Sequence, residues 1–249
     1  MILIGDIGNT DTKICLINSS YKIVKRFIIP TKKINNKNLK KSLSFLIKKK
    51  VFIQNTLFCS VVPKKFFLFK KFIKKIFKSK CIELKKLNLK KIIKIKANQK
   101  QIGSDRLANS IALASKKNNF IILDFGTATT FDVLIEKVYK GGVIAPGINI
   151  SLNTLIKRAT LIPTLNLKKI KNVIGKNTVS AVRSGFFWGY IGLINNIIEL
   201  IEKETKKSFK IIITGGFSGL FAKSLKSKVI IDKDITLKGL IKLAKLYNL

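Results

Sequence analysis

The sequence predicts an α/β fold made of two similar halves. Residues 6–17 and 124–135, written DIGNTDTKICLI and DFGTATTFDVLI, lie 118 positions apart and share Asp, Gly, Thr, Leu and Ile at five of twelve aligned places. Both segments follow an apolar run, and each predicts a strand, a tight glycine turn and a second strand. The chain has 249 residues, enough for one large domain or two modest ones. A duplicated fold is the natural interpretation.

The first half, expected as a domain over 1–116, alternates strands and helices. Its apolar pattern predicts strands at 2–6, 12–18, 21–29 and 55–61 and helices at 38–50 and 64–78. A lysine-rich stretch at 85–101 has little pattern. A last helix is expected behind Ser104, its predicted N-cap, with Leu107, Ile111 and Ala114 at helical spacing.

The second half, expected as a domain over 117–249, repeats this order. Its pattern predicts strands at 120–124, 130–136, 138–144, 210–214 and 228–231, and helices at 149–158, 179–203 and 235–247. Thr178 is the candidate N-cap of the long helix. No linker or low-complexity segment separates the halves, so the boundary near 115–118 is approximate.

Composition excludes several classes of protein and site. Apolar residues make up 47% of the chain, but no apolar run approaches the roughly 20 residues that cross a bilayer. The N-terminus enters a strand directly, without a leader pattern, so we expect a cytoplasmic protein that does not bind a membrane. Three widely spaced cysteines argue against a disulfide framework or a zinc site, and without histidine no Ser-His or Cys-His nucleophile can form. A general base must then be a carboxylate, a lysine or a tyrosine.

The net charge of +38 raises the question of nucleic-acid binding. Lysine is scattered through nearly every element, however, and the chain is also rich in isoleucine, asparagine and phenylalanine. This is typical of a compositional drift, not of a binding patch. We therefore expect no specific nucleic-acid partner, but weak, salt-sensitive attraction to polyanions, including ATP.

The paired Asp-x-Gly turns are the most informative motifs. Glycine lets backbone amides approach a phosphate oxygen, and the Thr and Asn side chains of such turns donate further hydrogen bonds. We expect Asp6 and Asp124 to face each other across a nucleotide cleft, where carboxylates hold the metal ions that screen phosphate. The alternative is that each turn is an ordinary hairpin, which the duplication makes less attractive.

Three further segments carry candidate chemistry. Gly103-Ser104-Asp105-Arg106 places an acid and a base in the first turn of a helix, where anions are attracted. Asp105 could accept a proton there and Arg106 could orient a carboxylate or phosphate, although a simple capped helix start explains the same residues. The segments at 141–147 and 214–217 combine a strand with glycines, which suits either close approach of a ligand or a structural turn.

Taken in order, these motifs resemble the type III pantothenate kinase family over nearly the whole chain. The matching segments are Asp6-Ile7-Gly8-Asn9-Thr10, Gly103-Ser104-Asp105-Arg106, Asp124-Phe125-Gly126-Thr127-Ala128-Thr129-Thr130, Gly142 with Pro146-Gly147, Asn177-Thr178, and Thr214-Gly215-Gly216. The resemblance implies phosphorylation of pantothenate by ATP, the entry step of coenzyme A synthesis. It also implies a duplicated ribonuclease-H-like, actin-like ATPase fold with a nucleotide cleft between two lobes, a homodimer, Mg²⁺ with the nucleotide, and a monovalent cation, K⁺ or NH₄⁺.

The resemblance also implies roles for individual residues. ATP binding falls to Asp6, Ile7, Gly8, Asn9, Thr10, Asp11, Thr12, Lys13 and Thr127. The substrate site falls to Gly103, Ser104, Asp105, Arg106 and Thr178, of which Thr178 would act across the dimer interface. Asp105 is similar to the proton acceptor of the family and Asp124 to its monovalent-cation ligand.

One departure from the family pattern concerns the stretch before the Gly-x-Asp-Arg motif. The family usually carries a tyrosine that contacts pantothenate, and a proline, where this chain reads Lys96-Ala97-Asn98-Gln99. Two other interpretations therefore stay open beside pantothenate kinase. One is a non-catalytic, regulatory protein of the same fold, and the other is a kinase for another small hydroxyl acceptor.

Overall fold

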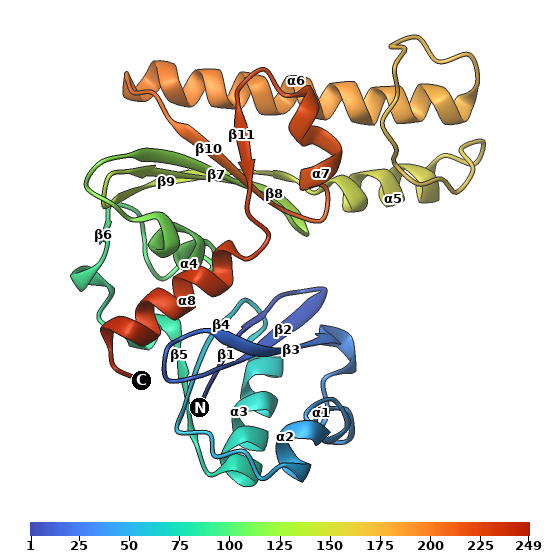
Figure 1. Cartoon of the computed structure of the whole chain (residues 1–249). Helices are drawn as coiled ribbons and strands as arrows, with labels where there is room; N and C mark the ends of the chain where they lie inside the picture. Colours follow the sequence, from blue (N-terminus) through green and yellow to red (C-terminus); the bar gives the residue numbers. More distant parts are fainter. The chain divides into compact units, whose positions relative to one another are not determined.

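The computed structural model describes all 249 residues and divides into two compact units (Figure 1). The first unit is Met1–Ala114 together with Asp234–Leu249, and the second is Ser115–Lys233. The last helix, α8 (Ile235–Leu246), packs against α4 (Ser104–Leu113) in the first unit. This differs from the predicted division, which placed the C-terminal helix in the second half. Gly239 of α8 lies so close to α4 that a Cβ there would collide with the Ala108 carbonyl oxygen.

The first unit is built on a mixed sheet in the strand order β3-β2-β1-β4-β5. The strands are β1 (Ile2–Ile7), β2 (Asp11–Ile17), β3 (Ile23–Pro30), β4 (Asn55–Ser60) and β5 (Lys80–Glu83). The first three form an antiparallel meander, while β4 and β5 run parallel to β1. In this register Asp6 pairs with Lys13 on one side and with Cys59 on the other.

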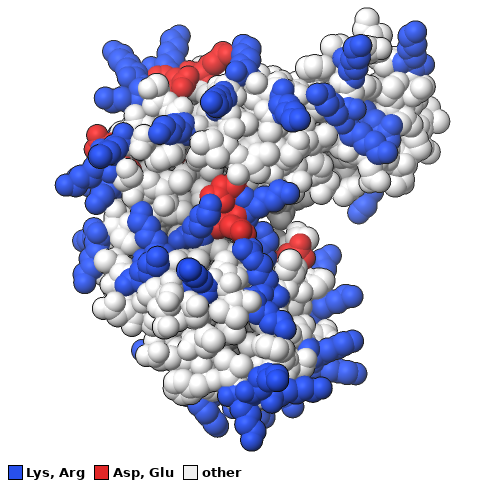
Figure 2. Space-filling view, viewed as in Figure 1, with Lys and Arg blue, Asp and Glu red and all other residues white.

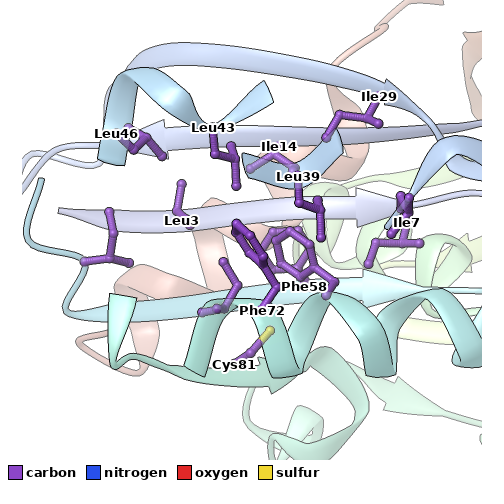
Figure 3. Close-up of a cluster of buried hydrophobic side chains, with 14 of the residues drawn as sticks. Leu3, Ile7, Ile14, Ile29, Leu39, Leu43, Leu46, Phe58, Phe72 and Cys81 are labelled. Carbon is purple, nitrogen blue, oxygen red and sulfur yellow. The ribbon is translucent and has the colours of Figure 1, made fainter. Parts of the chain in front are cut away.

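One face of this sheet carries the main core of the unit (Figure 3). The sheet contributes alternate side chains such as Leu3, Ile7 and Phe58, which are fully buried. The helices that cover them are α1 (Asn36–Ser42), α2 (Ser44–Lys48) and α3 (Pro63–Phe77). The Phe58 ring fits only because residue 5 is glycine, since a Cβ at Gly5 would overlap that ring. Alternation along the strands thus decides which side chains face the helices.

The other face of the sheet is covered by α4 and α8. Ile4 and Leu57 are fully buried on this face, and α8 contacts both β1 and β4. Arg26 of β3 donates two hydrogen bonds, of 2.6 and 2.8 Å, to the carboxylate of Asp234 at the start of α8. Two carboxylates belong to this side: Asp6, near the end of β1, and Asp105, in the first turn of α4.

The second unit repeats the topology of the first. Its strands are β7 (Asn119–Phe125), β8 (Ala128–Ile135), β9 (Val138–Pro146), β10 (Lys210–Gly215) and β11 (Val229–Ile231). In the second sheet they follow in the order β11-β10-β7-β8-β9, with β7, β8 and β9 antiparallel and β10 and β11 parallel to β7. Each strand therefore has a counterpart in the first unit, which confirms the duplication.

The core of the second unit lies between its sheet and the long helix α6 (Thr178–Thr205). Phe187, Ile194 and Ile198 of α6 are buried against strand residues such as Leu123 and Ile213. The other helical segments of this unit are α5 (Ile148–Arg158), α7 (Ser218–Phe221) and η4 (Ala222–Ser224).

Most predicted elements are confirmed within two or three residues, and the differences have local causes. The expected helix at 38–50 is two helices that meet at Leu43, whose fully buried side chain belongs to the core. The sequence pattern did not predict β5 or the short elements η1 (Thr31–Lys33), η2 (Leu84–Lys86), η3 (Leu89–Lys91) and β6 (Lys94–Ile95). None of the helices is long and apolar enough to cross a membrane.

Two predicted helix caps are wrong by one residue. Gly103, not Ser104, is the N-cap of α4, because the Ser104 hydroxyl bonds to another part of the unit. Asn177, not Thr178, caps α6: its side chain accepts from the Ser180 N–H at 2.9 Å, and the Ser180 hydroxyl completes a capping box.

The positive charge is spread over both units, as Figure 2 shows for one face. Lys and Arg side chains are scattered among uncharged residues over the visible face, and Asp and Glu are few. This distribution agrees with the scatter of lysine along the sequence.

Candidate active site

The turn between β1 and β2, residues 8–10, is the first candidate phosphate site. Its ends are joined by a 3.1 Å hydrogen bond from the Gly8 N–H to the Asp11 carbonyl. The side chains of Asn9, Thr10 and Asp11 are exposed, while Thr12 is fully buried and Lys13 is exposed again. Of the residues expected to bind ATP in this run, Asn9, Thr10, Asp11 and Lys13 therefore present side chains to solvent.

Asp6 precedes this turn at the end of β1. Its carboxylate is partly buried and accepts a hydrogen bond from the Cys59 thiol, with 3.4 Å between Sγ and Oδ1. Burial raises the pKa of Asp6 to about 7, and the negative charge of Asp105 contributes to the same rise. Cys59 is itself fully buried, and burial raises the pKa of its thiol well above the ordinary value, so that it stays a neutral donor.

The start of α4 supplies the second carboxylate, Asp105. Its Oδ1 accepts a 2.8 Å hydrogen bond from the Arg106 N–H. Burial raises the pKa of Asp105, while that N–H and the Arg106 guanidinium oppose the rise. A Cβ at Gly103 would collide with the Asp105 carboxylate. Glycine at position 103 therefore leaves room for the acid in this orientation.

Ser104 acts differently from the expected substrate contact. It is 3% exposed, and its hydroxyl donates at 2.5 Å to the Glu83 carboxylate at the end of β5. The other Glu83 oxygen accepts from the Lys85 N–H at 2.7 Å. Glu83 thus ties the first residue of α4 to the sheet and holds the neighbouring Asp105 in place.

The second unit carries its own Asp-x-Gly turn between β7 and β8. Here Gly126 N–H donates to the Ala128 carbonyl at 3.1 Å, and Thr127 is exposed at the tip. Gly147 and Gly215 pack closely against this turn. A Cβ on Gly147 would collide with the Thr127 carbonyl, and one on Gly215, whose φ is +85°, would lie 2.7 Å from Asp124 Oδ1.

These observations give a structural role to one glycine in each of the segments 141–147 and 214–217. Gly147 and Gly215 allow the neighbouring backbone to pack directly on the turn that follows Asp124. Gly215 also receives the Ser218 hydroxyl on its carbonyl at 2.9 Å. In each of the two segments, one glycine therefore has a structural role at the second turn.

The structure brings Asp6 and Asp105 within electrostatic reach of each other in the first unit, and it places Asp124 and Thr127 together in the second. Thr178 is exposed at the beginning of α6. Sequence reasoning missed Cys59, Glu83 and Thr31. Each is tied to a predicted site residue by a contact between chain positions far apart, which no local pattern reveals.

The residues present fit the ions that a kinase uses, although no group of three or more Cys, Asp and Glu side chains is arranged to hold a metal ion. Mg²⁺ is usually held by one or two carboxylates together with the nucleotide phosphates. Asp6, beside the first turn, is one such carboxylate. Asp124 is the penultimate residue of β7, the position that Asp6 has in β1.

A family model described as type III pantothenate kinase matches residues 2–200. A type III pantothenate kinase of Pelagibacter ubique is 66% identical over 242 residues, which cover 97% of this chain and 98% of that protein. The chain belongs to the type III pantothenate kinase family. A second relative, from Desulforapulum autotrophicum, is 34% identical over 248 residues, or 96% of this chain and 95% of that protein.

Solved structures agree on the fold. A Sinorhizobium meliloti protein described as a candidate 2-dehydro-3-deoxygalactonokinase superposes with a TM-score of 0.68 over 100% of this chain and 98% of that protein. Its identity is 11%, so this likeness concerns the fold alone. Together with the repeated strand order, it shows the duplicated ribonuclease-H-like fold of actin-like ATPases and sugar kinases. As a member of the type III pantothenate kinase family, the chain is a kinase, and its family implies ATP and a divalent metal ion.

Proposed function

We propose that this chain transfers the γ-phosphoryl group of ATP to the hydroxyl of pantothenate, forming 4'-phosphopantothenate, and that Asp105 is the proton acceptor. The observation that carries the residue assignment is the placement of Asp105. It lies in the first turn of α4, partly buried, and close enough to Asp6 beside the first turn to raise the pKa of that residue.

The protein takes little part in the covalent chemistry of this reaction. Phosphoryl transfer depends mainly on alignment and on screening the charge of the phosphates. Asp105 accepts the hydroxyl proton as the oxygen attacks phosphorus, and burial raises its pKa, which makes it a better base than an exposed Asp. The helix N-terminus beside it favours the negative charge that develops there.

We assign the nucleotide phosphates to the turn at 8–10 and to Lys13, and Thr127 keeps the ATP-binding role that the family resemblance implies. Exposed Asn9, Thr10 and Lys13 side chains and the glycine in the turn support this role. Asp6 would hold Mg²⁺ together with the nucleotide, and Asp124 would hold a monovalent cation, K⁺ or NH₄⁺. When bound, these ions neutralise charge that builds up on the phosphate oxygens.

Pantothenate carries a carboxylate, and we assign that group to Arg106. Gly103 and Ser104 complete the site by fixing the position of Asp105. Thr178 contributes from a second copy of the chain in a homodimer. Large apolar side chains left exposed in the second unit, among them Leu161 at 90% and Ile174 at 84%, support an interface there. Three free, buried cysteines suit a reducing compartment, and we place the enzyme in the cytoplasm.

The decisive experiment is Asp105→Asn, with ATP-dependent phosphorylation of pantothenate as the assay. We expect turnover to fall by about 10²- to 10⁴-fold while ATP binding stays within a few-fold of the unchanged protein. Glu204→Gln is a matched control, since it removes an equal charge from an exposed position on α6. Undiminished turnover in Asp105→Asn would refute the assigned base.

The substrate and the cation need a separate assay. Pantothenate should be phosphorylated by the unchanged chain with Mg²⁺ present, and faster with K⁺ than with Na⁺. The stretch Lys96-Ala97-Asn98-Gln99 lacks the tyrosine of the family pattern, so small sugars and hydroxy acids belong in the same panel. Turnover of one of those and not of pantothenate would replace the acceptor, whereas ATP binding without any product would indicate a non-catalytic protein.

A further inference from the structure

Thr31 is a buried polar residue that lies outside every motif of the sequence. It follows directly on β3, as the first residue of η1, and is 2% exposed. Both its side chain and its backbone reach the turn between β1 and β2. The Thr31 hydroxyl donates to the Gly8 carbonyl at 2.7 Å, and the Thr31 N–H donates to the Thr10 carbonyl at 2.8 Å.

A second buried hydroxyl supports this contact. Thr12 is 0% exposed, and its Oγ1 lies 2.9 Å from Oγ1 of Thr31. Each hydroxyl has a single proton. Because the Thr31 proton is donated to Gly8, the Thr12 hydroxyl must donate to Thr31. The three groups form a chain of hydrogen bonds that runs from β2 through Thr31 to the turn.

These bonds fix the direction of the turn amides. The chain has no cis peptide bond, and in a trans peptide the C=O and the following N–H point in opposite directions. Holding the Gly8 carbonyl toward Thr31 therefore turns the Asn9 N–H away from it, and holding the Thr10 carbonyl turns the Asp11 N–H away. The Asn9 N–H donates no hydrogen bond to the protein backbone.

We propose that Thr31, supported by Thr12, is a positioning residue for nucleotide binding: it holds the carbonyls of the turn inward so that the turn amides face the phosphate oxygens of ATP. The proposal rests on the proposed function, in which this turn binds the phosphates. Thr31 itself touches no nucleotide. An amide that is already oriented loses less conformational freedom when the ligand binds, which raises affinity.

This arrangement also changes the role of Thr12. The family resemblance places Thr12 among the residues that bind ATP, but its hydroxyl is fully buried and bonded to Thr31. Thr12 therefore acts through the turn. Its neighbours Asp11 and Lys13, which are exposed on the same strand, keep the direct contacts with the nucleotide.

The test compares Thr31→Val, which removes the hydroxyl at nearly constant volume, with Thr31→Ser, which restores it. Thr56→Val is the matched control, because Thr56 of β4 is also buried and its hydroxyl donates to the Lys80 carbonyl at 2.7 Å, away from the turn. The measurements are the Kd for Mg²⁺ with a non-hydrolysable ATP analogue, KM for ATP, KM for pantothenate, kcat and Tm.

We expect Thr31→Val to raise the Kd of the analogue and KM for ATP by about tenfold, the value of one hydrogen bond. The kcat at saturating ATP and the KM for pantothenate should stay within about twofold of the unchanged protein. This is the pattern expected when a substitution weakens nucleotide binding equally in the ground state and the transition state. Thr31→Ser should restore nucleotide affinity. Thr56→Val should lower Tm as much as Thr31→Val while leaving nucleotide affinity unchanged.

Several outcomes overturn the proposal. They are a Kd for Thr31→Val within twofold of the unchanged protein, equal losses of affinity in Thr31→Val and Thr56→Val, and no rescue by serine. If Thr31→Val does not fold, Thr12→Val decides, with an expected rise in Kd of about threefold. If the unchanged chain binds the analogue but does not phosphorylate pantothenate, the proposed function is wrong. The Kd values of the variants then still test the role of Thr31. If it binds no analogue, both fail.

Discussion

Replacing Asp6 by Asn should change the stability of the protein in a way that depends on pH. Burial and the charge of Asp105 raise the pKa of Asp6 from an ordinary value of 3.8 to about 7. Between these two values the folded chain holds a proton that the unfolded chain has released. The free energy of unfolding therefore falls as pH rises from about 4 to about 7, and Asp6 adds no further change above that range.

The size of the effect follows from the pKa shift. One pKa unit corresponds to about 1.4 kcal/mol, so the full shift of about three units corresponds to about 4 kcal/mol. Asp6 is partly exposed, and solvent screening reduces this figure. We expect about 2–4 kcal/mol, or on the order of 5–10 °C in Tm. Asparagine does not titrate, so the stability of Asp6→Asn relative to the unchanged protein should increase by this amount from pH 4 to pH 8.

Thermal unfolding of both proteins without nucleotide, at several pH values, measures the difference directly. Asp11→Asn is the control, since it removes an exposed carboxylate from the same hairpin. A difference between Asp6→Asn and the unchanged protein that is constant with pH would refute the reasoning, as would an equal trend in Asp11→Asn. The same variant should bind Mg²⁺ and ATP more weakly, which would make Asp6 a residue kept for function at the expense of stability.

Two further predictions follow from backbone geometry and from charge. Gly215→Ala should destabilise the fold by about 1–3 kcal/mol in urea unfolding, because residue 215 has a φ of +85° and a Cβ there would lie 2.5 Å from the Phe125 carbonyl. Gly216→Ala is the control, with no atom within 4 Å of the added Cβ, and an equal loss there would contradict the argument. Tm should rise between low and moderate salt concentration, since ions screen the repulsion of a +38 chain; a flat or falling Tm would be the contrary result.

The positions of the strands were predictable because their signals are local. Residues 6–17 and 124–135 alternate or cluster apolar side chains on either side of a glycine turn, and in the structure β1 ends at Ile7 and β7 at Phe125, again 118 residues apart. The strand Lys80–Glu83 was missed because four residues with a charge at each end carry no distinctive pattern. It becomes a strand by pairing with β4.

The acids and glycines of the candidate site were predictable from the sequence. The residues that hold them in position were not. Asp6, Asp105 and Asp124 stand in short motifs whose spacing along the chain is itself informative. Thr31 and Glu83 act across 23 and 21 residues, respectively, on Gly8 and Ser104. A hydrogen bond over such a separation depends on how strands and helices pack, which a single sequence does not display.

By itself the sequence determined the duplicated fold, the family and the identity of the candidate acids, because periodicity, turn chemistry and motif order are properties of neighbouring residues. Only the tertiary structure decided that α8 belongs to the first unit, that Cys59 donates to Asp6, and that Thr31 donates to the Gly8 carbonyl of the first turn. Each of these contacts joins residues that are far apart in the chain. It can form, and contribute to stability, only when the sheet and the helices have packed together.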